Sequence, residues 1–292
     1  MKTLLATLLI ALLTGCATTS APPIDRTYTA KGQSSRVKFV VLHYTVSDRP
    51  QSLKTLTEQV VSAHYLLTDD AVPVVYGLVD ETRQANHAGL SYWKGYTQLN
   101  ASSIGIEIVN PGFTEGPDGR IWYPFPQAQI DQLILLIKDL VAKHHVPPEN
   151  ILGHSDIAPG RKQDPGPMFP WFQLAQAGLI QWPEASRVIA VRPQYDQQLP
   201  DVTWFQKRLA HFGYATPQTG ELDTATKNVI TSFQMKYRPA TIDGVPDAET
   251  AALLDVLTTP APAPATTPAP APAPVPAPVP APAPMPEPAK AL

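Results

Sequence analysis

Two short apolar runs, each containing an ionisable residue, constrain the fold of this chain most strongly. The runs VKFVVLHYT (37–45) and SIGIEIVN (103–110) are nearly continuous in apolar side chains, which is typical of strands buried on both faces of a sheet. A third run, ILG, leads into a loop rich in proline and glycine. Because helical patterns separate these runs, the sequence predicts an α/β unit with a central mixed β-sheet flanked by helices.

Further segments complete this unit. Apolar residues at helical spacing predict helices, and another compact apolar run predicts a strand. The segments are a helix over 52–67, a strand over 72–79, a long helix over 128–145 and a last helix over 171–179. Ser52 is the expected N-cap of the first helix, and His64 is expected to pack on its core face. His144 and His145 end the long helix, where positive charge suits the helix dipole.

Ionisable residues lie where the predicted strands end. His43 follows VVL, Glu107 lies within IGIEI and His154 follows ILG. Side chains at strand ends of an α/β sheet commonly converge at one edge, where such folds place their sites. With Asp164 from the following loop, the two histidines would supply two imidazoles and one carboxylate, the ligand set of an open catalytic zinc. A structural role for each histidine is the alternative.

Glu107 is harder to explain as a structural residue. Burying an unpaired carboxylate in an apolar run is costly, so we expect a strong local partner such as a metal-bound water or a cation. The loop ILGHSDIAPGRKQDPGP (151–167) is stiffened by its prolines and glycines, so His154 and Asp164 would arrive preorganised. Lys162 lies two residues before Asp164.

The N-terminus predicts a secreted, lipid-anchored protein. Residues 1–15 have the charge and short apolar core of a signal peptide, and Leu13-Thr14-Gly15-Cys16 resembles the bacterial lipobox. The resemblance implies cleavage before Cys16 and acylation of its thiol, leaving 16–36 as a tether. Ala17, where an inner-membrane lipoprotein has Asp, suggests the periplasmic face of a Gram-negative outer membrane. An ordinary signal peptide with a chance cysteine is the alternative.

Composition narrows the chemistry and the partners. Cys16 is the only cysteine, so no disulfide can form within one chain and any zinc site must use His and carboxylate ligands. The formal net charge of −3 gives no basic patch, which argues against nucleic acid as a partner. We expect a monomer.

The C-terminal part predicts a second, smaller domain. After a proline-punctuated linker over 183–198, residues 199–258 show three short helical patterns, so we expect a small three-helix domain. Asp201, Asp223 and Asp247 are placed as caps or first-turn acids. Residues 259–292 are rich in alternating Ala and Pro and are predicted to be a disordered tail, with an extended spacer as the alternative.

Five blocks in order identify a family. FVVLHYT, VSAHYLL, NHAGLSYWKG, SIGIEIVN and ILGHSDIAPGRKQDPGP resemble the zinc-dependent N-acetylmuramoyl-L-alanine amidases, the class related to phage lysozyme amidases and peptidoglycan-recognition proteins. The resemblance covers about 37–179 and implies an amidase domain over 37–182. The lipobox and the second domain make the outer-membrane lipoprotein branch the best match. Residues 199–258 resemble the three-helix peptidoglycan-binding domain that is often attached to wall hydrolases.

The resemblance implies roles for individual residues. It makes His43, His154 and Asp164 the ligands of one zinc ion, with Asp164 where the phage enzymes have Cys. It makes Glu107 and Lys162 the catalytic glutamate and lysine. Three more residues fall in blocks that line the substrate cleft, with a fold-stabilising role as the alternative: Tyr44, His87 and Arg161.

The implied reaction is hydrolysis of the amide between N-acetylmuramic acid and L-alanine in peptidoglycan or muropeptides, with a zinc-bound water as nucleophile. Two other readings stay open. A zinc-free recognition protein has the same fold but lacks part of the ligand set, and a zinc peptidase would cut within the stem peptide. A cytoplasmic recycling amidase would lack the lipobox.

Overall fold

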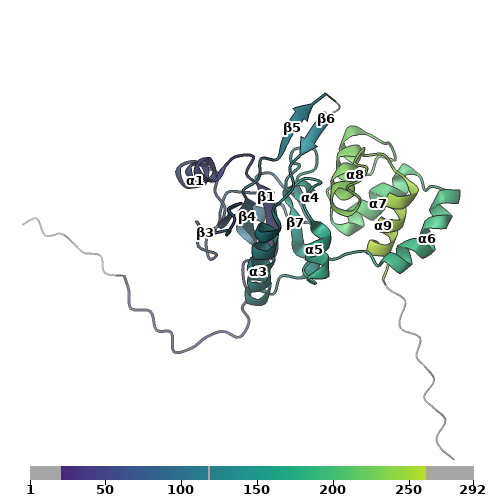
Figure 1. Ribbon diagram of the computed structural model, residues 1–292. Helices are drawn as coiled ribbons and strands as arrows, with labels where there is room; N and C mark the ends of the chain where they lie inside the picture. Colours follow the sequence, from purple (N-terminus) through teal and green to yellow (C-terminus); the bar gives the residue numbers. More distant parts are fainter. Residues whose placement is uncertain (1–20, 118, 261–292) are drawn as a thin grey trace, which may run out of the picture. The chain divides into compact units, whose positions relative to one another are not determined.

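The computed structural model describes residues 21–117 and 119–260, which form two compact units (Figure 1). The first unit ends at Ile180 and the second begins at Gln181. Cys16 and most of the Ala-Pro tail lie outside the described residues, so the predictions made for them stay predictions. Within the described ranges, no helix is both long and apolar enough to cross a membrane.

The first unit is built on a mixed five-stranded sheet with the order β3-β2-β4-β1-β7. The strands are β1 (Phe39–Tyr44), β2 (Tyr65–Leu67), β3 (Val75–Gly77), β4 (Ser103–Ile108) and β7 (Ile151–Gly153). Neighbouring strands run parallel except β3, which pairs antiparallel with β2 at the sheet edge. The predicted α/β fold with a central mixed sheet is therefore confirmed.

The sheet register brings the ends of the buried strands together. His43 of β1 pairs with Glu107 of β4, and Leu42 pairs with Gly153 of β7. His154 follows Gly153 directly and begins the short helix α4 (His154–Ile157). Paired positions on parallel strands point to the same side of the sheet, so His43 and Glu107 share one side at one edge.

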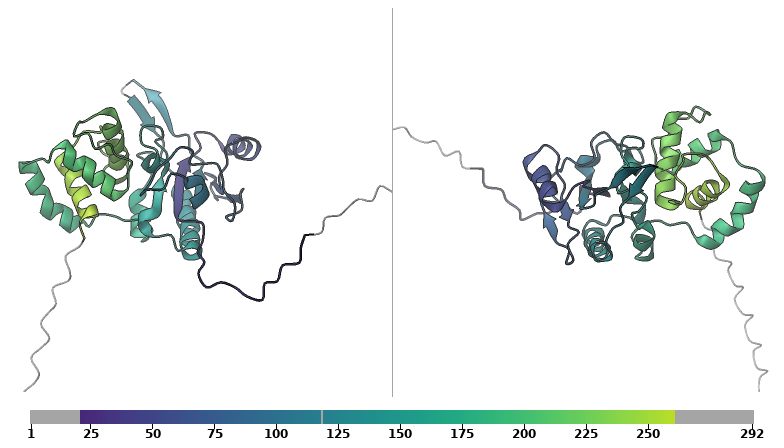
Figure 2. Two further views of the ribbon diagram at one scale, coloured as in Figure 1. Left: turned by 180° about the vertical axis from the view of Figure 1, so that it is seen from behind. Right: turned by 45° about the horizontal axis from the view of Figure 1, so that its top comes forward.

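Helices cover the sheet and bury its apolar strands. Figures 1 and 2 show α3 (Gln127–His144) lying along one face of the sheet, and its buried positions are Gln129, Ile130, Leu133, Ile137 and Leu140. The shorter helices are α1 (Arg49–Glu58), α2 (Leu99–Ser102), η1 (Pro148–Asn150) and α5 (Trp171–Gln176). Every residue of β1 except Tyr44 is buried, as its continuous apolar run predicts.

The helix predicted over 52–67 is wrong in its extent. α1 begins at Arg49 and ends at Glu58, and its N-cap is Asp48 rather than Ser52, because the Asp48 side chain accepts from the Gln51 amide. Residues 65–67 form β2, since their backbone groups pair with both β3 and β4. Tertiary pairing thus overrides the local helical spacing. His64 is fully buried, as expected, but it does not lie on a helix.

A two-stranded hairpin was not anticipated. β5 (Phe113–Gly116) and β6 (Gly119–Trp122) pair antiparallel and form a sheet separate from the central one. Figure 1 shows the hairpin projecting from the first unit. The Phe113 and Trp122 rings lie 5.0 Å apart, and the Arg120 guanidinium lies over the Phe113 ring. Such cross-strand aromatic pairs stabilise a hairpin that has little core of its own.

The second unit is helical: its described residues contain the three helices predicted within 199–258, preceded by one further helix. They are α6 (Ala185–Gln197), α7 (Val202–Phe212), α8 (Thr224–Tyr237) and α9 (Ala248–Thr258). The side chains of Asp201, Asp223 and Asp247 cap the last three of these helices, as predicted. His211, to which we assign no chemistry, is exposed in the last turn of α7.

The prediction that 183–198 is only a linker is wrong. These residues contain α6, which packs against α9 and includes Pro193 in its interior. A proline removes one helical hydrogen bond, but tertiary packing compensates here, because the buried Tyr195 ring lies 5.7 Å from the Trp204 ring.

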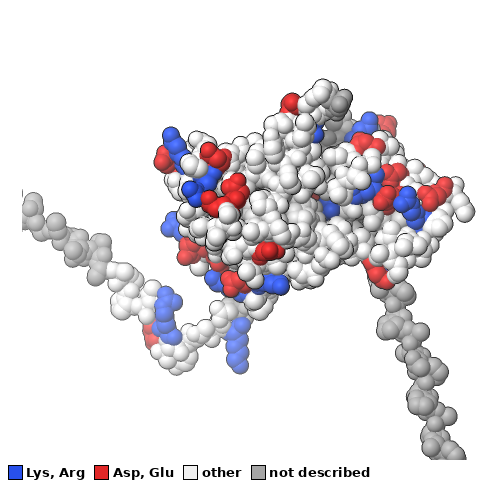
Figure 3. Space-filling view, in the orientation of Figure 1, with Lys and Arg blue, Asp and Glu red and all other residues white. Residues whose placement is uncertain are grey.

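Charged side chains of both signs are interspersed on the face drawn in Figure 3. Over the region of α1, basic and acidic atoms lie side by side. Arg49, the first residue of α1, forms an ion pair with Asp70, with Nη1 and Oδ2 2.8 Å apart and side chains that are 42% and 39% exposed. Exposed pairs of this kind contribute little to stability.

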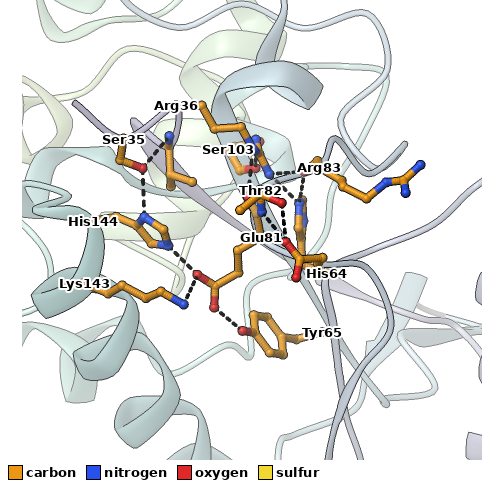
Figure 4. Close-up of polar contacts among 12 residues, drawn as sticks. Ser35, Arg36, His64, Tyr65, Glu81, Thr82, Arg83, Ser103, Lys143 and His144 are labelled. Carbon is orange, nitrogen blue, oxygen red and sulfur yellow. Dashed lines mark hydrogen bonds and ion pairs between the residues drawn. The ribbon is translucent and has the colours of Figure 1, made fainter. Parts of the chain in front are cut away.

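A partly buried polar cluster around Glu81 connects the segment before β1, at Ser35 and Arg36, to the rest of the first unit (Figure 4). Glu81 Oε2 contacts Lys143 Nζ at 2.8 Å and His144 Nε2 at 2.5 Å, and Tyr65 donates to Oε1. His144 Nδ1 also lies 2.8 Å from Ser35 Oγ. Burial alone would raise the pKa of Glu81, but hydrogen bonds from Lys143, Tyr65 and His144 lower it to about 2. The folded state therefore favours the ionised carboxylate.

We predict that Glu81→Gln destabilises the first unit at pH 7 by about 1.5–3 kcal/mol, the range for lost hydrogen bonds to a charged group. Because the folded pKa lies below the unfolded value, the stabilisation is full above about pH 4.5 and is lost as the pH falls toward 2. Urea unfolding of the full chain at pH 7 and pH 3, read from hydrogen exchange in β1 and β4, measures the difference. Glu115→Gln, an exposed carboxylate beside Arg120, is the matched control. Equal stability of Glu81→Gln and wild type at pH 7 would refute this role.

Candidate metal centre and active site

Three side chains from separate segments converge at the edge of the sheet where β1 and β7 end. His43 Nδ1 lies 2.9 Å from His154 Nδ1 and 2.9 Å from Asp164 Oδ2, and His154 Nδ1 lies 3.0 Å from Asp164 Oδ2. The residues are 1%, 3% and 7% exposed. One ion can touch all three atoms at zinc–ligand bond lengths of about 2.0–2.2 Å. This group can therefore hold a metal ion.

Local structure delivers the ligands from the loop. His154 begins α4, and the Ser155 amide donates to the Asp164 carbonyl at 2.9 Å, so the loop closes back on the start of the helix. Inside it, the amides of Arg161 and Lys162 both donate to the Ala158 carbonyl. The predicted preorganisation of His154 and Asp164 thus rests on backbone hydrogen bonds as well as on proline and glycine.

The protonation states suit metal binding. Burial and the neighbouring His154 lower the pKa of His43 to about 4, so its imidazole is neutral at pH 7. Burial would raise the pKa of Asp164, but His154 and His43 hold it below its usual range, so the carboxylate is ionised. Metal ligands must be deprotonated in this way. The residues present therefore fit a divalent ion such as zinc.

Glu107 presents a buried oxygen next to this centre. Its Oε2 has no hydrogen-bond partner among the described residues, and burial together with the charge of Asp164 raises the pKa of Glu107 well above its usual value. A buried carboxyl oxygen without a partner is costly. Its place beside His43 in the register is typical of a group whose partner is a reactant or a bound cation.

The residues that the sequence predicts for metal binding, catalysis and substrate contact all line one cavity of about 380 Å³. They are His43, Tyr44, His87, Glu107, His154, Arg161, Lys162 and Asp164. Tyr44 is half-buried, and burial together with Asp164 raises its pKa to about 12, so it is a neutral hydrogen-bonding group. Lys162 brings a positive charge to the same cavity.

Two of the predicted substrate contacts have protein partners in the structure. His87 is 9% exposed, and its Nδ1 lies 3.0 Å from His43 Nε2. Arg161 Nη2 donates to the carbonyls of Ala88 at 2.7 Å and Leu90 at 2.6 Å. These contacts match the fold-stabilising alternative, and the substrate role of both residues stays a prediction.

Other groups near the ligands were not found from the sequence. Ser103 Oγ lies 3.1 Å from His87 Nε2, and the Ala88 carbonyl lies 3.1 Å from His154 Nε2. A backbone carbonyl carries no residue-type signal, and a serine at the start of a strand is too common to single out. Only the fold brings these groups to the histidines.

Comparison with known proteins agrees with this geometry. The family model for N-acetylmuramoyl-L-alanine amidase matches residues 33–167, and the model for a peptidoglycan binding domain matches residues 198–254. The chain is 41% identical over 240 residues to the N-acetylmuramoyl-L-alanine amidase AmiD of Escherichia coli (strain K12), covering 80% of this chain and 87% of that protein. It is 40% identical over 111 residues to the 1,6-anhydro-N-acetylmuramyl-L-alanine amidase AmpD of Enterobacter cloacae, covering 38% of this chain and 54% of that protein.

Solved structures share the fold over most of the chain. AmiD from E. coli, in complex with the substrate anhydro-N-acetylmuramic acid-L-Ala-D-γ-Glu-L-Lys, gives a TM-score of 0.74 at 41% identity and covers 80% of this chain and 93% of that chain. AmpDh3 from Pseudomonas aeruginosa gives a TM-score of 0.76 at 36% identity and covers 81% and 98%. On this identity and coverage, the chain belongs to the N-acetylmuramoyl-L-alanine amidase family, whose enzymes are zinc-dependent, and it carries a C-terminal peptidoglycan-binding domain.

Proposed function

We propose that this amidase holds one zinc ion on His43, His154 and Asp164 and uses a water molecule as its nucleophile. The bond it hydrolyses joins N-acetylmuramic acid to L-alanine in peptidoglycan or muropeptides. The observation that carries the proposal is the triangle of ligand atoms, with sides of 2.9, 2.9 and 3.0 Å, next to the unpartnered Glu107 Oε2. When bound, zinc supplies a Lewis acid that lowers the pKa of water toward 7 and polarises a carbonyl.

Glu107 is the proposed general base. Its Oε2 is free to accept a proton from the attacking water and can return that proton to the leaving amine. Burial raises the pKa of Glu107, and a cation in the neighbouring site would lower it again toward the working pH. A base whose pKa lies near the working pH transfers protons most efficiently.

Lys162 is the proposed stabiliser of the tetrahedral oxyanion. It lines the same cavity as the ligands and lies two residues before Asp164. A positive charge beside the scissile carbonyl would favour the negative charge that develops on its oxygen.

Two further proposals concern where the enzyme works. We propose that acylated Cys16 anchors the chain in the outer membrane, on the periplasmic side, and that it acts there as a monomer. We also propose that the C-terminal domain binds peptidoglycan, which its match to the peptidoglycan binding domain over residues 198–254 supports. The solved complexes of relatives contain anhydromuramic peptides, so this class is included among the proposed substrates.

The zinc proposal predicts one zinc per chain by elemental analysis of the purified protein. Asp164→Ala removes the only charged ligand of the group, so we expect its zinc affinity to fall by roughly 100-fold or more. Asp70→Ala, an exposed acid paired with Arg49, should keep the full zinc content. A wild type without zinc, or an Asp164→Ala variant that binds it normally, would contradict the assignment.

The catalytic proposal predicts that Glu107→Gln and Lys162→Met each lower kcat by about 10²–10⁴-fold while zinc content stays normal. The measurement is release of stem peptide from defined muropeptides, with product masses that report which bond is cut. Lys138→Met, an exposed residue of α3, is the matched control. Near wild-type turnover in both variants would show that the roles are wrong, and products that keep L-alanine on the sugar would show a peptidase.

The anchor proposal predicts that the wild type incorporates labelled palmitate and fractionates with outer membranes. Cys16→Ala removes the only thiol in the chain, so it should lose the label and leave the membrane fraction. Labelling that persists in Cys16→Ala, or a wild type that is never labelled, would rule out this anchor.

A further inference from the structure

A chain of hydrogen bonds connects the Leu99 carbonyl to His43 through Ser103 and His87. The carbonyl at its start determines which atom donates in each of these bonds. The Leu99 carbonyl, in the first residue of α2, can only accept a hydrogen bond. The Ser103 hydroxyl donates to it. With its proton committed there, Ser103 Oγ can only accept from its next neighbour, His87 Nε2, at 3.1 Å.

The donor role of His87 toward Ser103 determines which nitrogen of His43 carries a proton. His87 Nε2 must carry a proton to donate to Ser103, so in the neutral ring Nδ1 has a free lone pair. That lone pair faces His43 Nε2 at 3.0 Å, so His43 Nε2 carries the donated proton. The neutral His43 ring then has its lone pair on Nδ1, the atom that lies 2.9 Å from both other ligand atoms. The chain therefore selects the tautomer of His43 that can bind a metal.

The same segment orients the second imidazole. His154 Nε2 lies 3.1 Å from the Ala88 carbonyl, which can only accept, and 3.4 Å from Arg161 Nη2, which can only donate. The shorter contact favours a proton on Nε2, which leaves the Nδ1 lone pair facing the centre. Arg161 Nη2 donates to the same carbonyl at 2.7 Å and holds it in place. Residues 87 and 88 therefore contact Nε2 of both histidine ligands, the ring nitrogen opposite the one that faces the metal centre.

The His87 ring fits against β4 because residue 105 is glycine and has no side chain. A Cβ added to Gly105 would lie 2.4 Å from His87 Cγ, closer than any real contact, so only glycine lets the ring lie against the strand. The Gly105 amide also donates to His64 Nδ1 at 3.0 Å, and the His64 ring contacts the His87 ring edge to face. His87 lines the cavity, but it is 9% exposed and both of its ring nitrogens already have protein partners.

We propose that His87 is a positioning residue that, together with Ser103, fixes the tautomer and ring orientation of His43 for metal binding. This differs from the substrate contact that the family resemblance implies for His87. The inference rests on the proposed zinc site only for the identity of the metal, because the hydrogen bonds that select the tautomer of His43 are made by protein groups.

The first test reads the tautomer directly. Long-range proton–nitrogen NMR spectra of the metal-free full chain, with ¹⁵N-labelled histidine, distinguish a protonated Nε2 from a protonated Nδ1. We expect His43 and His87 to be protonated at Nε2 only, and Ser103→Ala to populate the other His87 tautomer. A wild-type His43 protonated at Nδ1 would overturn the proposal.

The second test measures zinc affinity by chelator competition. We expect His87→Phe, which keeps a ring without hydrogen bonds, to bind zinc about 10–100-fold more weakly, and Ser103→Ala to be weakened in the same direction. His87→Gln should recover affinity, since its amide can accept from His43 and donate to Ser103. Ser102→Ala is the matched control, because its hydroxyl donates to the Gln98 carbonyl outside this chain of hydrogen bonds.

The outcomes separate the proposal from its rivals. Unchanged zinc affinity in His87→Phe and Ser103→Ala, with a raised KM alone, would favour substrate contact and overturn the proposal. If His87→Phe does not fold, the zinc affinity of Ser103→Ala and the His43 tautomer in the wild-type spectrum still test the proposal. A wild type with the expected tautomers but no amidase activity would contradict the proposed function and leave this inference standing.

Discussion

The convergence of a buried carboxylate and two buried imidazoles on one point is the constraint on which the site depends. Asp164 Oδ2 lies within 3.0 Å of Nδ1 of both His43 and His154, and all three residues are nearly inaccessible to solvent. Burying three acceptor atoms this close together is costly unless a cation pairs with them. The parallel register of β1 and β7 makes this convergence possible, because it ends both strands at the same edge of the sheet.

Hydrogen bonds from Arg36 connect the residues behind this centre to the Glu81 cluster. Arg36 donates to the carbonyls of Glu81 at 2.8 Å, Ala101 at 3.0 Å and Ser103 at 3.2 Å. It thereby ties the segment before His87 to the segment that carries Ser103. The residues that face the metal site are therefore held by a network that begins where the chain enters the unit. Preorganisation of this kind holds ligand geometry at low cost on binding.

The sequence predicts the parts of the structure where local pattern and tertiary environment agree. β1, β4, β7 and α3 follow from continuous apolar runs and helical spacing, and the residues predicted for the site meet in one cavity. Prediction failed where pairing with distant segments decides, as in β2, and where packing offsets a proline, as in α6. The Ala88 carbonyl and Gly105 could not be predicted for a different reason. Both act through the position of the backbone, and a single sequence carries no signal for that position.

We propose above all that His43, His154 and Asp164 hold the catalytic zinc. Anomalous diffraction from crystals of the full chain grown with zinc, recorded on both sides of the zinc absorption edge, locates the ion directly. The account predicts one site within about 2.0–2.2 Å of Nδ1 of both histidines and of an Asp164 carboxylate oxygen. A zinc ion bound at other residues, with this triangle of ligand atoms left without metal, would contradict it.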